Sequence, residues 1–130
     1  MFYKEIKTTN DTEIELVVKE IFENDWKFLY LNGDLGAGKT TLTKAIAKKL
    51  GIKENITSPT FNIMKIYKGL VHIDAYNING DLDEFEDYFE DNKVIIEWSN
   101  NLDLNYENVL EIDILFDQEN NRIYRIKKEK

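Results

Sequence analysis

Apolar side chains recur along the chain at two different spacings, and each spacing predicts one kind of element. Residues 10–24 carry apolar side chains every three or four positions, which is the spacing of one helix face, and Asn10 or Asp11 precedes them as a cap. Residues 39–51 repeat this spacing and end at Gly51, a residue type that often terminates helices. We therefore predict two amphipathic helices in the first half of the chain.

Short apolar runs bounded by turn residues predict strands in the rest of the chain. Residues 2–8 alternate weakly, as an edge strand does, and residues 27–33 form a buried-type run that ends in glycine. Between two later strands, residues 81–89 have apolar side chains at helical spacing and predict a short helix. The fold class that follows is α/β, with a mixed, mostly parallel central sheet, flanking helices and additional antiparallel strands. The later predicted strands are 61–68, 70–76, 93–98, 108–116 and 122–128.

Composition limits the kind of protein that this sequence encodes. A chain of 130 residues, 42% hydrophobic and without cysteine, predicts a single domain over residues 1–130 with neither disulfides nor thiolate metal sites. The N-terminus is charged, and the longest apolar runs are about four residues, against roughly 20 for a membrane span. We therefore expect a soluble, cytoplasmic protein that does not enter a membrane. The net charge of −8 argues against a chain that binds nucleic acid alone, because such proteins carry basic surfaces.

The stretch GDLGAGKTT, residues 33–41, fits the P-loop pattern G-x-x-x-x-G-K-[ST] between a predicted strand and a predicted helix. Glycines allow successive backbone N–H groups to point at one anion, and the helix N-terminus adds its positive end. Lys39 suits the outer phosphates, the Thr40 hydroxyl suits Mg²⁺, and Thr41 is placed for an inner phosphate. The alternative is a glycine-rich turn that binds nothing. The predicted strand before the loop and the predicted helix after it favour a site for a nucleoside triphosphate with Mg²⁺. The predicted loop set is Gly33, Asp34, Leu35, Gly36, Ala37, Gly38, Lys39, Thr40 and Thr41.

Acidic residues end two of the predicted strands and are candidates to hold Mg²⁺ or to orient water. Asp74 ends LVHID and Glu97 ends KVIIE, where a carboxylate is unfavourable unless it is paired or bound to metal. The alternative for either residue is a strand-end carboxylate that faces solvent. Thr60, in TSPTF, is a candidate sensor of a γ-phosphate, with a capped turn as the alternative. With Lys39, these residues form the predicted catalytic set.

Other residues near these motifs have both structural and functional interpretations. His72 is the chain's histidine, and a lone histidine is more typical of a hydrogen-bonded structural position. Trp98 follows Glu97 and packs over the site or a partner, with core packing as the alternative. The arginines, Arg122 and Arg125, lie near the C-terminus, so residues 40–120 lack the arginine-bearing lid of small-molecule P-loop kinases. Without an arginine finger we expect slow hydrolysis by the chain alone. Trp98 and Arg122 complete the predicted nucleotide-binding set.

The motifs GDLGAGKTT, TSPTFNI, HIDAY and VIIEWSN, in this order, resemble the TsaE family of P-loop ATPases. The resemblance extends over residues 8–128. It implies a P-loop NTPase fold, binding of ATP with Mg²⁺, weak hydrolysis, and the partner proteins TsaD and TsaB. It also implies a role in tRNA threonylcarbamoyladenosine biosynthesis. In that pathway a threonylcarbamoyl group is placed on the adenosine next to the anticodon of tRNAs reading codons that begin with A, and contact of this subunit with tRNA is indirect.

The resemblance also implies roles for individual residues. Thr40 and Glu97 correspond to the Mg²⁺ ligands, Thr60 to a switch-like threonine, and Thr12 to a helix-start threonine near the nucleotide base. Asp74 and Trp98 correspond to the family's aspartate in H-x-D-x-Y and to the tryptophan after the metal ligand. Two departures bear on partner contacts: Asn77 stands where arginine is common, and residues 77–91 form a shorter segment. A small-molecule P-loop kinase and a nucleotide-gated binding module, in which hydrolysis is incidental, are the alternative functions.

Overall fold

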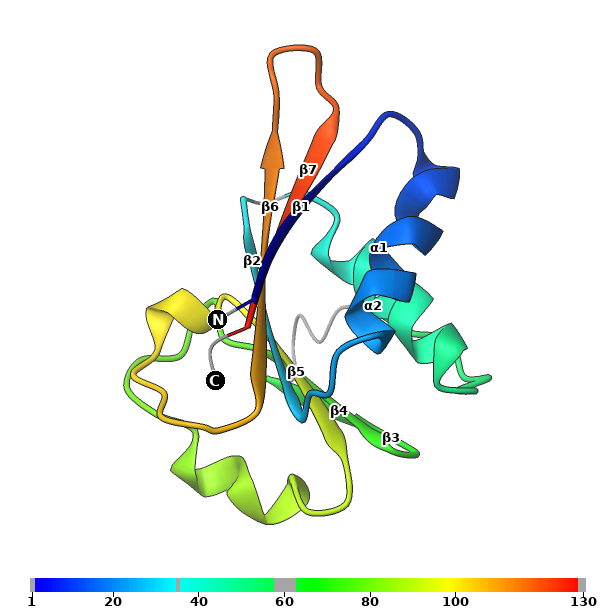
Figure 1. The fold of residues 1–130 in the computed structure, drawn as a ribbon. Helices are drawn as coiled ribbons and strands as arrows, with labels where there is room; N and C mark the ends of the chain where they lie inside the picture. Colours follow the sequence, from blue (N-terminus) through cyan, green and yellow to red (C-terminus); the bar gives the residue numbers. More distant parts are fainter. Residues whose placement is uncertain (1, 35, 58–62, 129–130) are drawn as a thin grey trace.

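The computed structural model describes residues 2–34, 36–57 and 63–128 (Figure 1). Seven strands in these ranges form one sheet: β1 (Phe2–Thr8), β2 (Phe28–Gly33), β3 (Met64–Tyr67), β4 (Leu70–Asp74), β5 (Lys93–Glu97), β6 (Val109–Phe116) and β7 (Arg122–Lys128). The helices are α1 (Ile14–Phe22) and α2 (Lys39–Lys49), with the short 3₁₀ helices η1 (Asp11–Glu13), η2 (Asp83–Tyr88) and η3 (Ser99–Asn101). No helix in the described part of the chain has the length and apolar character needed to cross a membrane.

The strand order is β1-β7-β6-β2-β5-β4-β3, and its centre is parallel. β2 lies between β6 and β5 and runs parallel to both, and β4 runs parallel to β5. β7 and then β1 extend the sheet with antiparallel pairing on one side, and β3 extends it with antiparallel pairing on the other. The predicted α/β class, with a mixed sheet that is mostly parallel in its middle, is confirmed. The carboxyl ends of β2, β4 and β5 meet at one edge, which is where ligands bind in sheets of this kind.

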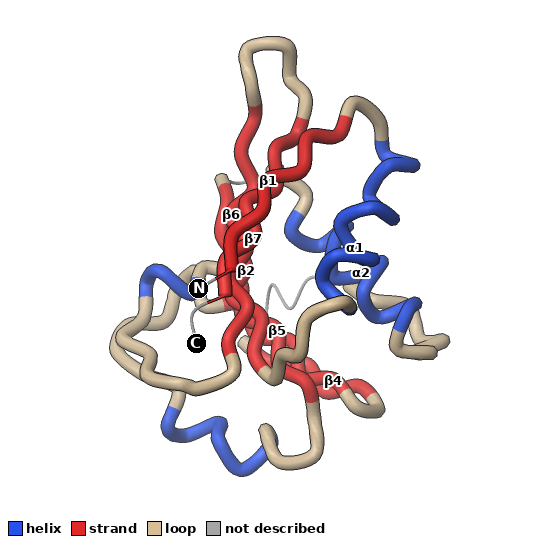
Figure 2. The backbone as a smooth tube through the Cα atoms, viewed as in Figure 1, coloured by secondary structure: helices blue, strands red, loops and turns tan. Residues whose placement is uncertain are grey.

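The two faces of the sheet are covered differently (Figures 1 and 2). α1 and α2 lie on one face, and Leu29 and Leu31 of β2 pack with them in one apolar cluster. η2 and the loops before and after β5 cover the other face, where Phe28 and Tyr30 belong to a second cluster. The alternation along β2 follows from the period of two in a strand, which sends successive side chains to opposite faces. The predicted flanking helices are therefore confirmed, with both α-helices on the same face.

The predicted helices are present, with two differences in form. The segment predicted as one helix over 10–24 begins with η1, where the Asn10 side chain accepts a hydrogen bond from the Thr12 N–H (3.1 Å), and continues as α1. The short helix predicted over 81–89 is the 3₁₀ helix η2. Gly51 terminates α2 as predicted, with φ +85°.

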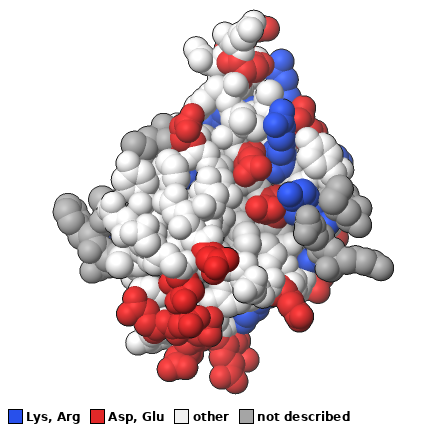
Figure 3. Space-filling model, turned by 90° about the vertical axis from the view of Figure 1, so that its left-hand side faces the viewer, with Lys and Arg blue, Asp and Glu red and all other residues white. Residues whose placement is uncertain are grey.

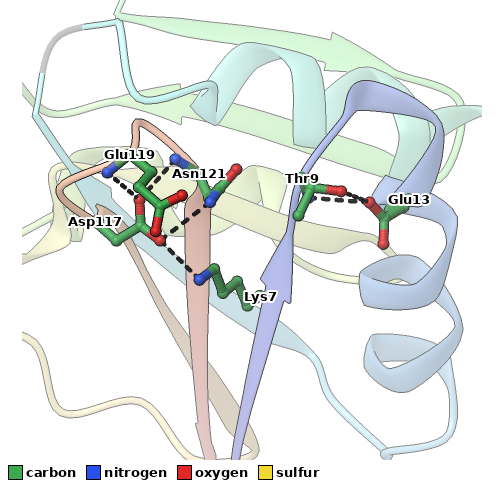
Figure 4. Close-up of polar contacts among 6 residues, drawn as sticks. All are labelled: Lys7, Thr9, Glu13, Asp117, Glu119 and Asn121. Carbon is green, nitrogen blue, oxygen red and sulfur yellow. Dashed lines mark hydrogen bonds and ion pairs between the residues drawn. The ribbon is translucent and has the colours of Figure 1, made fainter.

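The turn between β6 and β7 is organised around one carboxylate, Asp117 (Figure 4). Its Oδ1 accepts the backbone N–H groups of Glu119 (2.8 Å) and Asn121 (2.9 Å). Its Oδ2 is 3.0 Å from the Nζ of Lys7 on β1. The Lys7 hydrogen bond, followed by the backbone bond from Asn121, lowers the pKa of Asp117 to about 2. The turn therefore fixes the start of β7, at Arg122, to the neighbouring strand β1.

Candidate functional site

The loop between β2 and α2 is here called the glycine loop, and its described residues 33, 34 and 36–38 make a bend that requires glycine. Gly36 and Gly38 have φ of +80° and +103°, the left-handed region in which other residues are strained. Gly33 lies so close to β6 that a Cβ atom there would be 2.9 Å from the Ile114 carbonyl oxygen. α2 begins directly after the loop, and the first N–H groups of a helix have no partner within it. The bend thus presents backbone donors at one place, as anion sites do.

Lys39 is a buried cation beneath the glycine loop. Its side chain is buried, and its Nζ donates to the carbonyl oxygens of Gly33 (2.6 Å) and Asp34 (2.9 Å). The same Nζ lies 4.3 Å from the centre of the Trp98 ring. Burial lowers the pKa of Lys39, and the carboxylate of Glu97 opposes that shift. The loop therefore holds a largely desolvated ammonium group whose bonds to carbonyl oxygens can be exchanged for bonds to an anion.

Two carboxylates lie side by side at the ends of adjacent strands. The register of β4 and β5 places Asp74 opposite Glu97. Glu97 is buried, and Oδ1 of the half-buried Asp74 accepts the Tyr76 N–H (3.0 Å). Burial raises the pKa of Asp74, and the negative charge of Glu97 adds to that shift. Neighbouring carboxylates of this kind favour a cation between or beside them.

A cavity of about 290 Å³ separates the glycine loop from Glu97. Arg122, at the start of β7, enters this cavity although it is far from the loop in sequence. Its Nε donates to the Ala37 carbonyl oxygen (2.9 Å). The cavity therefore combines backbone donors, two cationic side chains, hydroxyl groups and a carboxylate. Its lining residues are Gly36, Gly38, Lys39, Thr40, Thr41, Glu97 and Arg122.

The remaining predicted site residues have different placements. Trp98 covers Lys39, and its ring also contacts Tyr76, with 5.0 Å between ring centroids. Thr12 is exposed on η1, donates its hydroxyl to Asn10 Oδ1 (2.5 Å), and is not among the residues that line the cavity. Leu35 and Thr60 lie outside the described residues. Gly33, Asp34 and Ala37 shape the loop or bond to its cations without lining the cavity.

Two polar residues that support the site were not assigned to it by sequence reasoning. His72 is buried, and its Nε2 lies 2.5 Å from Oε2 of Glu97. Its predicted structural, hydrogen-bonded character is confirmed, but its partner is the candidate metal-binding carboxylate. Asn32, near the end of β2, accepts hydrogen bonds through Oδ1 from the Ser99 hydroxyl (3.1 Å) and the Asn100 N–H (3.2 Å). In the sequence, each of these residues is a polar residue within a strand of buried type. Such residues are rare unless they are paired, and this pattern could have pointed to them.

Among the described residues, no group of three or more His, Cys, Asp or Glu side chains gathers as an all-protein metal site. A hard cation at this place would therefore need oxygens in addition to the Thr40 hydroxyl and the carboxylates of Glu97 and its neighbour Asp74. That donor set suits Mg²⁺, which keeps several waters and binds through one or two carboxylates together with substrate phosphates. The residues present thus fit a magnesium-bound anion better than a free metal ion.

Comparison with known proteins gives the family. The model described as "Threonylcarbamoyl adenosine biosynthesis protein TsaE" matches residues 7–125. The chain belongs to the TsaE family. The proteins named "tRNA threonylcarbamoyladenosine biosynthesis protein TsaE" from Streptomyces coelicolor and Bacillus subtilis are 43% and 37% identical to it over 79 and 102 residues, or 52% and 72% of this chain. The chain spans 53% and 65% of the lengths of these two TsaE relatives.

A longer match and a solved structure extend this finding. The TsaE protein of Rickettsia typhi is 37% identical over 125 residues, which cover 88% of this chain and 85% of that protein. The crystal structure of YdiB from Bacillus subtilis matches with a TM-score of 0.73 and 29% identity, covering 96% of this chain and 84% of that one. The resemblance to the TsaE family that the motifs predicted is therefore confirmed over nearly the whole chain.

Proposed function

We propose that this chain is an ATP-binding, slowly hydrolysing P-loop subunit required for threonylcarbamoyl modification of the adenosine next to the anticodon in tRNAs reading codons that begin with A. The observation that carries the proposal is the buried Lys39 ammonium beneath a glycine loop, across a cavity from Glu97. Membership in the TsaE family and the names of its relatives support the pathway. TsaD and TsaB are the proposed partners, in the cytoplasm, and tRNA contact is indirect.

The chemistry of the cavity fits ATP with Mg²⁺. The loop N–H groups, Lys39 and Arg122 would bind the phosphates, while Thr40 and Glu97 would ligate Mg²⁺. When bound, Mg²⁺ neutralises charge on the phosphates. Asp74, beside Glu97, is suited to orient water because burial already raises its pKa. Thr41 completes the loop set on the cavity side.

Other residues are proposed for positions around the phosphates. Trp98 limits the access of water to Lys39, because its ring lies against the ammonium group. Thr60 would sense the γ-phosphate, and Thr12 would lie near the base. The Nε–H of Arg122 is bonded to the Ala37 carbonyl oxygen, so this arginine is not preset for a developing charge. We therefore expect slow hydrolysis until the partner proteins reorganise the site.

Calorimetric titration of the purified chain with ATP and Mg²⁺ tests the proposal. Lys39→Met is expected to weaken binding by at least about tenfold, a difference of roughly 1.4 kcal/mol, because it removes the ammonium group from the loop. The matched control is Lys44→Met, which removes an exposed lysine from the same helix and should bind as the wild type does. An absence of heat from ATP with Mg²⁺, even when TsaD and TsaB are added, contradicts the proposal.

The products of the reaction separate the proposal from the kinase alternative. Labelled ATP should release phosphate to water, whereas a phosphorylated metabolite indicates a small-molecule kinase. A Glu97→Ala variant addresses the binding-module alternative. We expect this variant to bind ATP, to hydrolyse it poorly and to fail in repeated rounds of tRNA modification. Full support of those rounds means that hydrolysis is dispensable.

A further inference from the structure

His72 and Glu97 form a buried pair at the edge of the sheet where the candidate site lies. Their exposed fractions are 0% and 3%, and the Nε2 to Oε2 distance is 2.5 Å. The register of β4 and β5 places His72 opposite Ile95, two residues before Glu97, so the two side chains share a face of the sheet. Two adjacent parallel strands therefore build the pair.

The second imidazole nitrogen of His72 indicates that this histidine serves to hold the Glu97 carboxylate. Nδ1 of His72 is buried and has no hydrogen-bond partner among the described residues. A buried polar atom without a partner destabilises a fold, and an apolar side chain of similar size would avoid that loss. The Nε2–H donor is thus the feature of this histidine that the rest of the structure uses, and its acceptor is Glu97.

The two carboxylates at this edge are held by different donors. Oδ1 of Asp74 is occupied by the Tyr76 N–H, and Oε2 of Glu97 by His72. Each carboxylate therefore keeps one oxygen outside these bonds. Glu97 lines the cavity together with Lys39 and Thr40, and Oε1 is the Glu97 oxygen that the contact with His72 leaves unengaged.

We propose that His72 is a positioning residue that restricts Glu97 to one-oxygen ligation and thereby favours Mg²⁺ over Ca²⁺, an inference that rests on the proposed function. Mg²⁺ requires a compact octahedral shell and takes one oxygen from a carboxylate, whereas Ca²⁺ readily accepts both oxygens. Groups that hydrogen-bond to a metal ligand orient it, and their loss typically reduces metal affinity 10- to 100-fold. His72 acts in this way through Glu97 without touching the ion.

The test compares nucleotide binding with different cations. The probe is the non-hydrolysable ATP analogue adenylyl imidodiphosphate, titrated by calorimetry in EDTA, in Mg²⁺ and in Ca²⁺. In His72→Leu we expect unchanged affinity in EDTA and a fall of about tenfold in the ratio of Mg²⁺-supported to Ca²⁺-supported affinity. His72→Gln, which keeps an N–H donor at the position of Nε2, should retain the wild-type ratio. Should the leucine variant fail to fold, His72→Asn, which is polar but too short to reach Glu97, replaces it.

A double-mutant cycle separates positioning from general support of the fold. In a Glu97→Ala background the His72→Leu change should no longer alter the cation ratio, because its target is gone. A wild-type cation ratio in His72→Leu overturns the inference, and so does an equal loss of affinity in all three media. If the wild-type chain binds the analogue in none of the media, the proposed function fails and this inference with it. Normal binding with an unchanged ratio leaves the proposed function standing and removes only the role of His72.

Discussion

Gly38 is a residue of the glycine loop where a side chain would meet both a left-handed backbone and a residue of the site. Its φ is +103°, and an added Cβ would lie 3.2 Å from Nε of Arg122. We expect Gly38→Ala to lower the free energy of unfolding by about 1–2 kcal/mol, the strain of a left-handed backbone for alanine. It should also weaken ATP binding, because the Arg122 side chain has to shift away from the added Cβ at the lining of the cavity. Thermal unfolding and calorimetric titration measure the two effects.

Gly51 offers a matched control for that substitution. Its φ is +85°, and an added Cβ would meet nothing within 4 Å. Gly51→Ala should therefore lower the free energy of unfolding through backbone strain alone and leave the affinity for ATP unchanged. Equal affinities in the two variants would mean that the contact between Gly38 and Arg122 is irrelevant to binding.

Some features of the site can be recognised from the sequence, whereas others cannot. The spacing of Gly33, Gly38 and Lys39 is local, so the pattern alone located the loop. The bond of Arg122 to Ala37 joins positions 85 residues apart and depends on the turn before β7. The pairing of His72 with Glu97 depends on the register of two parallel strands. Local patterns do not fix such registers, which is why these contacts were not predicted.

At the scale of an element, the β6–β7 hairpin should be sensitive to acid. The pKa of Asp117 is about 2 in the folded chain, and an aspartate in an unfolded chain titrates near about 3.9. Because folding lowers the pKa, the stabilisation from Asp117 is fully present above about pH 4 and is lost as the pH falls through about 2. We expect thermal stability to fall across this window, with faster amide exchange at the start of β7.

Asp117→Asn gives the comparison for the hairpin. The amide oxygen still accepts the backbone N–H groups of Glu119 and Asn121, but the ion pair with Lys7 is lost. The variant should be less stable than the wild type at neutral pH and should lose less stability between pH 4 and 2. If both proteins lose the same stability between pH 4 and 2, other carboxylates determine the sensitivity to acid.

Elements were predicted well where the pattern is local and less well where tertiary contacts decide. The bounds of β1 and β7 match the predicted strands 2–8 and 122–128, because each is an alternating run between turns. Their mutual antiparallel pairing was not predicted, since it joins the two ends of the chain. The 3₁₀ form of η2 also escaped prediction, because helical spacing of apolar residues does not distinguish a tight turn from an α-helix.

At the scale of the whole molecule, charge is distributed unevenly. Figure 3, a view onto the side away from α1 and α2, shows acidic side chains gathered at the lower end, where η2 lies. With a net charge of −8, this surface repels phosphate, and Lys39 and Arg122 lie inside a small cavity rather than on an open face. The exposed acidic residues of this region are Asp81, Asp83, Glu84, Glu86, Asp87, Glu90 and Asp91.

This charge distribution predicts that the chain alone does not bind tRNA. Phosphate contacts supply most of the affinity in non-specific binding, with dissociation constants of about 10⁻⁴–10⁻⁶ M at physiological salt for proteins with basic surfaces. Titrating labelled tRNA with the chain at about 150 mM salt should therefore leave the fluorescence anisotropy unchanged up to micromolar concentrations. Addition of the proposed partners TsaD and TsaB should raise the anisotropy. A saturable rise with the chain alone, weakening steeply as salt increases, would mean that its own lysines neutralise phosphates and that contact with tRNA is direct.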